Sequence, residues 1–451
     1  MNGKDTIVPG RARTFHGGTH LPEYKEFTVD KRIRLVPASS VVSLPLSQHI
    51  GAPNVSLVKV NDHVKMGQRI GEAKAFISAP VHATVSGKVK VIKDIFNPVY
   101  GKRPAIVIEN DREDTMDPLI VDKDPESLSK EDIINIVKDA GIVGMGGAAF
   151  PTHVKLNVPK EKTIDTLIIN GAECEPYLTC DHRLMIEKTD EILKGAELVA
   201  KALGVKSIFI AIEKNKLGAI FIIQKALREL CKRSRHSGTE VIMLKTKYPQ
   251  GGEKQLIKAV LKREVPPGKL PLDVGVVVQN VGTCFAIYQA AYHKKPLIER
   301  CMTLTGSCLK EPGNFIVRIG TSLKDVIEFS GGFKEAPEKV IIGGPMMGFT
   351  QHTLDLPIIK GVTGAIFLSK KEMKLYEETA CVRCAKCVDI CPVNLMPTEI
   401  MRMVKHSRWH YINELYAKDC MECGVCAYIC PSRIPLVQYI KLAKAEELKR
   451  I

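Results

Sequence analysis

Residues 144–152, GMGGAAFPT, place three glycines ahead of a phenylalanine and a proline. Read literally, the stretch satisfies the dinucleotide fingerprint G-x-G-x-x-G/A from Gly144 onwards. That fingerprint needs a buried strand before it and a helix after it. The preceding residues 131–143, EDIINIVKDAGIV, have a helical period instead, and Pro151 is expected to break a helix rather than open one. The context therefore argues against a Rossmann fingerprint.

Two interpretations of the glycine loop remain. A P-loop is excluded because no G-K-[ST] follows the glycines. A Gly-x-Gly-Gly run can still turn successive backbone N–H groups toward a ring or a phosphate, and Lys155 could neutralise that phosphate. The alternative, judged on these glycines alone, is a flexible turn from helix to loop that binds nothing.

Residues 128–300 around this loop alternate helix and strand. Four apolar runs predict buried strands: 163–173 (TIDTLIINGAE), 207–215 (SIFIAIEKN), 239–249 (TEVIMLKTKYP) and 273–280 (DVGVVVQN). Amphipathic stretches between them predict helices, so we expect an α/β layer with a largely parallel sheet. Ligands in such folds lie outside the carboxyl ends of the strands. The polar loops 170–176, 248–253 and 279–283 follow three of these strands and should converge there.

The C-terminal part of the chain carries the most specific motif. Eight of the 14 cysteines form two copies of C-x2-C-x2-C-x3-C-P, at Cys381, Cys384, Cys387, Cys391 and at Cys420, Cys423, Cys426, Cys430. Three thiolates on one loop can bind three irons of a [4Fe–4S] cluster, and the fourth cysteine typically serves the other cluster. The expected ligand sets are Cys381, Cys384, Cys387 with Cys430, and Cys420, Cys423, Cys426 with Cys391. Structural zinc is the alternative, but it would leave the third cysteine of each triplet surplus.

Bulk properties narrow the partners. The chain has 451 residues and a formal charge of +15, from 65 basic and 50 acidic residues, which favours anionic partners. The basic residues are scattered without an aromatic–basic motif, so nucleic acid is not expected. The start of the chain is polar and predicts no secretion, so metal or redox work is preferred to disulfides for the cysteines. No uninterrupted run of about 18 apolar residues predicts a membrane span.

The remaining segments complete a multidomain α/β organisation. We expect an N-terminal arm at 1–35, a barrel-sandwich hybrid domain at 36–127, the FMN/NAD-binding α/β domain at 128–300, a β-grasp (SLBB-like) domain at 301–370 with a helix starting at Ser322, and a helical two-[4Fe–4S] ferredoxin domain at 371–451. Between the cysteine motifs, apolar spacing predicts helices near residues 400–404 and 412–416. Lys74 lacks the flanking residues of biotinylated or lipoylated lysines and is interpreted as a solvated side chain.

Two motifs carry a family resemblance. GMGGAAFPTHVK at 144–155 and NGAECEP at 170–176 resemble the FMN signature of the NADH-oxidising flavin subunit of respiratory complex I, G-R-G-G-A-G-F-P-T-G-x-K and N-A-D-E-x-E-P. With its FHGGTH arm, barrel sandwich, β-grasp and cluster domains, nearly the whole chain resembles the RnfC family of Rnf electron-transport complexes. These are membrane ferredoxin:NAD oxidoreductases coupled to sodium or proton pumping.

The resemblance implies FMN, two [4Fe–4S] clusters and NAD(H) as the substrate. It assigns backbone contacts with FMN to Gly144 and Gly146, the phosphate to Lys155, the flavin or ribityl chain to Asn170 and Glu173, and the nicotinamide nucleotide to Phe150 and Glu175. Tyr248, Gly251 and Glu253 match a third loop of the family, and Gln279, Asn280 and Thr283 a fourth. No side chain is expected to act as a catalytic acid or base.

Four positions depart from the family signature. Met145 stands where the complex I loop has arginine, Ala172 replaces an aspartate, Gly252 replaces a glutamate, and Gln279 replaces an asparagine. The ribityl contacts and the grip on NAD are the interactions that these changes affect.

The implied role is conversion between hydride transfer and single-electron transfer. The expected partners are the other Rnf subunits, especially the iron–sulfur protein RnfB and the membrane subunits, with ferredoxin acting indirectly; the expected location is peripheral, at the cytoplasmic face of the cell membrane. The net charge of +15 suits docking to an acidic iron–sulfur partner. Two alternatives stay open: a cobalamin reductase of microcompartments, and a cluster-bearing adaptor with a degenerate flavin site.

Overall fold

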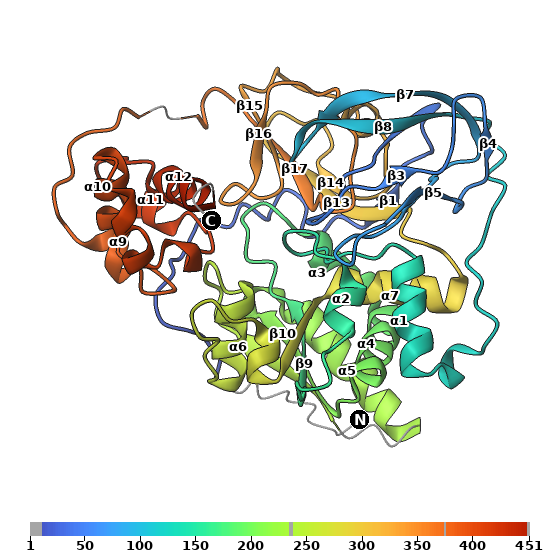
Figure 1. Cartoon of the computed structure of the whole chain (residues 1–451), viewed down its shortest axis with the longest axis horizontal. Helices are drawn as coiled ribbons and strands as arrows, with labels where there is room; N and C mark the ends of the chain where they lie inside the picture. Colours follow the sequence, from blue (N-terminus) through green and yellow to red (C-terminus); the bar gives the residue numbers. More distant parts are fainter. Residues whose placement is uncertain (1–10, 234–237, 374–375, 449–451) are drawn as a thin grey trace, which may run out of the picture.

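The computed structural model describes residues 11–233, 238–373 and 376–448. The chain folds into a β-rich N-terminal unit, a central α/β unit, a mixed sheet unit and a small helical C-terminal unit (Figure 1). None of the described helices is both long and apolar enough to cross a membrane.

The N-terminal unit is a sandwich of two small antiparallel sheets, as the hairpin-rich sequence predicted. One sheet has the order β2-β8-β7-β4, with β2 at Val41–Pro45, β4 at His63–Val64, β7 at Gly87–Asn97 and β8 at Gly101–Asn110. The other has the order β3-β5-β6, with β3 at Val55–Ser56, β5 at Arg69–Glu72 and β6 at Val81–His82. Lys74 is exposed beyond the end of β5.

The central unit has the parallel sheet that the sequence predicted. Its order is β11-β10-β9-β12, with β9 at Thr166–Gly171, β10 at Ser207–Glu213, β11 at Thr239–Leu244 and β12 at Val276–Asn280. Because β9 has β10 on one side and β12 on the other, the connections reverse direction between β9 and β12. Ligands in doubly wound folds bind at such a switch point.

Alternation along the strands gives this sheet two apolar faces. Leu167 and Ile169 of β9 belong to the large core, together with residues of α1 (Lys130–Asp139), α4 (Thr189–Leu203), α5 (Leu217–Arg233) and α7 (Val281–His293). Ile168 points to the opposite face, where α6 (Glu253–Leu261) packs. A strand turns successive side chains to opposite faces, so a continuous apolar run such as LII satisfies both layers of helices.

The third unit is a six-stranded sheet, to which the N-terminal arm contributes an edge strand. Its order is β1-β14-β13-β17-β15-β16, with β1 at Ile33–Leu35, β13 at Glu299–Thr305, β14 at Gly313–Arg318, β15 at Lys339–Ile342, β16 at Phe349–Gln351 and β17 at Gly364–Leu368. The predicted helix is α8, Leu323–Phe329, and the Ser322 side chain caps it by accepting from the Lys324 N–H. That prediction is confirmed.

The C-terminal unit, over its described residues, contains the helices α9 (Lys386–Asp389), α10 (Pro397–Lys405), α11 (Val425–Ile429) and α12 (Leu436–Leu448). Helix α10 confirms the expectation for residues 400–404. The expectation of a helix at 412–416 is wrong, since the chain there makes short 3-10 turns at Asn413–Leu415 and Ala417–Asp419. Tyr416 between them adopts a left-handed conformation with φ 53°, which interrupts an α-helix.

The expectation for Pro151 is also wrong. A short helix, α2 at Thr152–Leu156, begins directly after it. The φ of Pro151 is −56°, and a fixed φ of this kind suits the entry to a helix. The element before the glycine loop is the predicted helix, α1, so the loop still joins helix to helix and lacks the strand that a dinucleotide fingerprint requires.

Candidate functional site

The glycine loop is a closed turn whose tip faces solvent. Val143 and Pro151 form an antiparallel bridge, and the Gly144 N–H donates to the Phe150 carbonyl at 2.8 Å. Between them, residues 146–148 are exposed. A Cβ added at Gly147 would meet no atom within 4 Å, so the backbone at this tip is open to a ligand.

Met145 ties the glycine loop to the core. Its side chain is 4% exposed and belongs to the large core cluster. Its N–H donates to the Thr283 Oγ1 at 3.0 Å, and its carbonyl accepts from the buried Arg300 guanidinium at 2.6 Å. The loop is therefore anchored at its base, which a flexible turn would not be. The buried methionine also means that this position presents no side chain to a ligand.

The fourth loop supports the glycine loop from the end of β12. A Cβ at Gly146 would lie 2.8 Å from the Asn280 Nδ2, so only glycine allows this approach. Asn280 caps α7 by accepting from the Gly282 N–H at 2.8 Å, and it donates to Asp181 at 2.6 Å. The neighbouring Gln279 is 2% exposed, and its Nε2 has no hydrogen-bond partner within the described part of the chain. Such an orphaned donor is uncommon in a finished core and suits a site that a ligand completes.

The second and third loops are joined by direct bonds. The Asn170 Nδ2 donates to the Gly251 carbonyl at 2.9 Å, while its Oδ1 accepts from the Ala172 N–H at 3.1 Å. Lys155 pairs with Glu253 at 2.7 Å, and the two side chains remain 30% and 38% exposed. The lysine that was predicted to meet a phosphate therefore lies at the carboxyl end of the sheet, with a carboxylate as its present partner.

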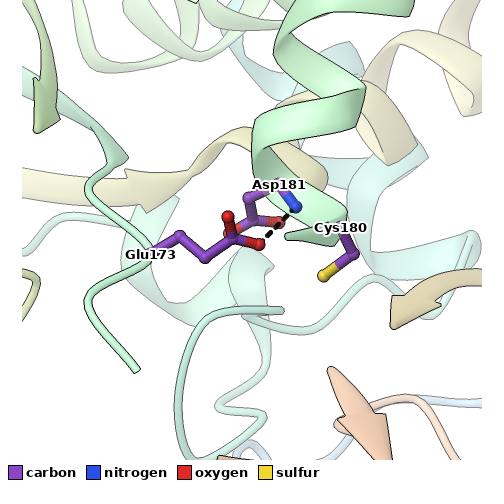
Figure 2. A group of neighbouring side chains, drawn as sticks. All are labelled: Glu173, Cys180 and Asp181. Carbon is purple, nitrogen blue, oxygen red and sulfur yellow. Dashed lines mark hydrogen bonds between the residues drawn. The ribbon is translucent and has the colours of Figure 1, made fainter. Parts of the chain in front are cut away.

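Glu173 organises the start of α3, Cys180–Glu187 (Figure 2). Its carboxylate accepts from the Asp181 N–H at 2.7 Å and from the His182 N–H at 3.2 Å. Burial, followed by the charge of Glu173, raises the pKa of Asp181 to about 6. Glu173, Cys180 and Asp181 offer ligand atoms within 4.8 Å of one another. Each of them already has a partner, because the Cys180 thiol donates to the Thr363 carbonyl and Asp181 accepts from Asn280.

Glu175 and Tyr248 lie where three units meet. The Tyr248 hydroxyl donates to the Glu175 carboxylate at 3.4 Å. Backbone N–H groups of Met346 and Met347, from the third unit, donate to the same carboxylate at 3.1 and 3.0 Å. Burial raises the pKa of Glu175 to about 7, against the opposing effect of these N–H donors.

Tyr248 also links the flavin loops to the cysteine motifs. It shares an apolar cluster with Cys423 and Val425 of the C-terminal unit, and partly buried side chains pack around them: Leu21, Cys174, Met346, Ile390 and Met421. The approach is close, since a Cβ at Gly252 would lie 2.6 Å from the Met421 methyl group. Glycine at position 252, where the family signature has glutamate, thus leaves room for the cysteine-bearing unit.

The two cysteine motifs differ in exposure. We define the outer cysteine loop as residues 381–387 and the inner cysteine loop as residues 420–426. Cys381 and Cys384 of the outer loop are exposed, whereas Cys423 and Cys426 of the inner loop are buried. Burial raises the pKa of Cys423 to about 12, and the neighbouring Cys420 and Cys391 add to the shift. Cys391, from the end of the first motif, therefore lies beside the inner loop.

The buried thiols fit an iron–sulfur cluster. A thiolate is costly in these surroundings unless a nearby positive charge compensates it, and metal ions provide that charge. Backbone N–H groups already point at two of the sulfurs, from Leu395 to Cys391 and from Glu422 to Cys420, both at 3.3 Å. Hydrogen bonds of this kind to ligand sulfurs are typical of iron–sulfur sites.

A hollow of about 390 Å³ lies beside the site, beyond Tyr248. The arm lines one side with Leu21 and Lys25, and the carboxyl ends of β10 and β11 line the other with Glu213 and Lys247. Of the residues predicted to bind cofactors, only Tyr248 lines this hollow.

Sequence reasoning missed a set of buried charges beneath the flavin loops. Lys25 of the arm donates to the backbone carbonyls of Glu173, Glu175 and Leu178. Lys216 donates to the Ala172 carbonyl at 2.7 Å, and Arg300 to Met145. Because single charged residues in a basic chain look like solvated surface, their sequence carried no signal. Asp181, five residues beyond the NGAECEP motif, was the one detectable candidate.

Comparison with known families accounts for most of the chain. Residues 13–113 match the RnfC barrel sandwich hybrid domain and residues 137–289 the Nuo51 FMN-binding domain. Residues 302–350 match the SLBB domain, and residues 380–434 the 4Fe-4S dicluster domain. The predicted fold class and the FMN and iron–sulfur cofactors are thereby confirmed.

Full-length relatives decide the family. Component C of the proton-translocating ferredoxin:NAD(+) oxidoreductase complex of Clostridium ljungdahlii is 46% identical over 96% of this chain and 94% of its own length. Component C of the Na(+)-translocating complex of Acetobacterium woodii is 44% identical over 96% of this chain and 97% of its own length. The chain belongs to the RnfC family. Component C of the ion-translocating oxidoreductase complex of Rhodobacter capsulatus, at 40% identity over 98% of this chain and 86% of its own, extends the RnfC group to a third organism.

Among solved structures, an NAD+-reducing [NiFe]-hydrogenase in its air-oxidised state aligns with a TM-score of 0.51 at 20% identity. The alignment covers 63% of this RnfC chain and 54% of the hydrogenase chain. At this identity the match describes the fold alone.

Proposed function

We propose that this chain is the RnfC electron-transfer subunit of a membrane-bound, ion-translocating ferredoxin:NAD oxidoreductase. It would exchange hydride with NAD(H) at an FMN site and single electrons through two [4Fe–4S] clusters. Its near-full-length relatives are named as component C of such complexes. The observation that carries the proposal is the shared apolar cluster of Tyr248 and Cys423, because it brings a predicted flavin loop and a predicted cluster loop into direct contact.

The residues at the carboxyl end of the sheet would hold the flavin. Gly144 and Gly146 would offer backbone groups, Asn170 and Glu173 would meet the ring or the ribityl chain, and Lys155 would exchange Glu253 for the phosphate. Tyr248, Gly251, Gln279, Asn280 and Thr283 would complete the walls. Phe150 and Glu175 would receive the nicotinamide nucleotide.

FMN supplies the switch between two-electron hydride transfer and one-electron transfer, and the iron–sulfur clusters carry single electrons. The chain's part is to bind and orient these groups and to keep water from them. Glu253 and Lys155 would compensate charge at the phosphate end, while the orphaned Gln279 donor would bond the ligand. No side chain needs to act as an acid or base.

The cysteine loops would divide the work by position. Cys420, Cys423 and Cys426 with Cys391 would ligate the cluster nearest the flavin loops. Cys381, Cys384 and Cys387 with Cys430 would ligate the second cluster, whose exposed cysteines suit exchange with a partner. An acidic iron–sulfur protein of the same complex fits the +15 charge of this chain. The chain would then sit peripherally on the cytoplasmic face of the membrane, beside the membrane subunits.

Anaerobic titration of the reconstituted chain with NADH tests the proposal. We expect NADH to bleach the flavin absorbance and then to produce the EPR signals of reduced clusters. Protein that holds the full iron of two clusters but no FMN would instead be a cluster-bearing adaptor, and the proposal would be wrong. Cobalamin bound at the flavin loops would favour the cobalamin reductase alternative.

A further inference from the structure

The N-terminal arm runs along the flavin unit before it reaches the cysteine-bearing unit (Figure 1). Arg13 pairs with the edge of β11, because its N–H donates to the Met243 carbonyl and its carbonyl accepts from the Lys245 N–H, both at 2.9 Å. The Arg13 guanidinium donates to the Val260 carbonyl at 2.7 Å. This part of the arm is therefore fixed to the flavin unit by backbone and side-chain bonds.

Phe15 provides a second anchor. The Lys247 ammonium donates to the Phe15 carbonyl at 2.7 Å and lies 4.1 Å from the centre of its ring. Phe15 itself is 7% exposed. A cation held over an aromatic face and bonded to the same residue fixes both the ring and the backbone.

Gly17 and Gly18 then bridge two loops that the proposed function makes important. The Gly18 N–H donates to the Ile390 carbonyl at 2.8 Å, next to Cys391. Thr19 exchanges two backbone hydrogen bonds with Tyr248, both at 2.8 Å. Within three residues, the arm is bonded to the backbone of an inner cluster ligand's neighbour and to the third flavin loop.

Only glycine fits at either position of this bridge. Both residues are left-handed, with φ of 76° and 72°. A Cβ at Gly17 would lie 2.9 Å from the Cys391 carbonyl oxygen, and a Cβ at Gly18 would lie 2.5 Å from the Tyr248 carbonyl oxygen. Both contacts are with backbone, so a neighbouring side chain cannot relieve them by moving.

We propose that Gly17 and Gly18 are positioning residues that set the separation between the Tyr248 loop and the Cys391 backbone, and with it the rate of electron exchange between the flavin site and the inner cluster. The proposal rests on the proposed function. The flavin unit reaches the cysteine-bearing unit elsewhere through side chains, such as the Gln255 amide that donates to the Pro392 carbonyl at 3.2 Å. The arm adds a short backbone connection that tolerates little change in length.

The test compares Gly18→Ala with Gly101→Ala. Gly101 has the same φ of 72°, but a Cβ there meets nothing within 4 Å, so this control adds the backbone strain without the contact. In stopped-flow experiments with NADH, we expect both variants to bleach the flavin at the wild-type rate. In Gly18→Ala alone, the following reduction of the clusters should slow by about tenfold or more, since displacements near 1 Å can have effects of this size.

Two further readouts keep the result independent of turnover. Hydrogen–deuterium exchange of residues 14–20 should accelerate in Gly18→Ala and stay at the wild-type rate in Gly101→Ala. Lys247→Met, which removes the Phe15 anchor without adding a clash, should also slow cluster reduction, by several-fold, and it provides the test if Gly18→Ala does not fold.

Cluster reduction at the wild-type rate in variants whose arm exchanges faster would overturn the proposal. Failure of NADH to bleach the flavin in the wild-type chain would instead contradict the proposed function. In that event, the arm is judged by exchange together with the EPR line shape of the chemically reduced inner cluster. An unchanged line shape in Gly18→Ala would then overturn the positioning role.

Discussion

The outer and inner cysteine loops have the same sequence spacing and nearly the same backbone, yet they occupy opposite environments. Left-handed residues recur at matching positions of the two motifs: Arg383 and Glu422, Ala385 and Gly424, Asn394 and Arg433. The outer loop nevertheless exposes Cys381 and Cys384, whereas the inner loop buries Cys423 and Cys426. Local sequence therefore determines the shape of a cluster-binding loop, and its neighbours determine which role the loop can take.

The neighbours of the inner loop come from three other parts of the chain. Tyr248 belongs to the flavin unit, Leu21 to the arm, and Met346 to the third unit. A cluster held there would be shielded from solvent on the flavin side. If this difference in environment separates the two roles, then equivalent substitutions in the two loops should have unequal consequences.

The largest effect is expected from removing one equivalent cysteine in each loop. Cys384→Ser and Cys423→Ser should each lose one cluster, so the iron content should fall by half. With Cys384→Ser, NADH should still reduce the remaining inner cluster. With Cys423→Ser, NADH should leave the remaining outer cluster oxidised, because the connection to the flavin loops is lost. Iron analysis and EPR after NADH addition measure both outcomes.

Dithionite serves as the control, because it should reduce the remaining cluster in either variant. If NADH reduced the outer cluster in Cys423→Ser as fast as it does in the wild type, the assignment of inner and outer roles would be wrong.

A medium effect is expected where the backbones of the two loops match but the residues differ. Gly424 and Ala385 occupy equivalent left-handed positions, with φ of 83° and 59°. A Cβ at Gly424 would lie 3.2 Å from the Met346 carbonyl oxygen. Gly424→Ala should therefore destabilise the protein by about 1–2 kcal/mol, the cost of a left-handed residue with a Cβ. Ala385→Gly should relieve that cost, partly offset by about 0.5–1 kcal/mol of backbone entropy.

The midpoint of thermal loss of the cluster absorbance measures these changes. A decrease with Gly424→Ala and a small increase with Ala385→Gly would support the comparison. Midpoint shifts of the same sign for both substitutions would show that the two loops do not share one conformational rule.

The sequence allowed more of the architecture than of the site to be predicted. The strand at 276–280, its polar turn and the helix after it follow directly from apolar runs that end in amide and glycine residues. The cysteine motifs are equally local. The helix expected at 412–416 was lost because the left-handed Tyr416 interrupts it, and apolar spacing does not reveal such a residue.

What sequence reasoning could not supply are contacts between distant segments. Gly17 and Gly18 looked like part of a polar arm, and only the fold places them against Tyr248 and Cys391. The buried Arg300 that holds the Met145 carbonyl lies 155 positions away in the chain. Such contacts depend on how four units pack, whereas periodicity reports on one element at a time.

The smallest expected effect concerns Glu175, which lies on the flavin side of the inner loop. Burial raises its pKa to about 7, above the value of about 4.3 for an exposed glutamate. Between these two pH values the folded chain binds more protons than the unfolded chain, so the free energy of unfolding should fall as pH rises from about 4.5 to 7 and level off above it. Glu175→Gln should remove that slope, by less than about 1.4 kcal/mol per pH unit. Thermal midpoints at pH 5, 6, 7 and 8 measure it, with Glu378→Gln, an exposed carboxylate near the outer loop, as the control for loss of one surface charge. An identical pH profile for Glu175→Gln and the wild type would mean that Glu175 is already ionised at the domain interface, and the inner loop would then face a fixed negative charge.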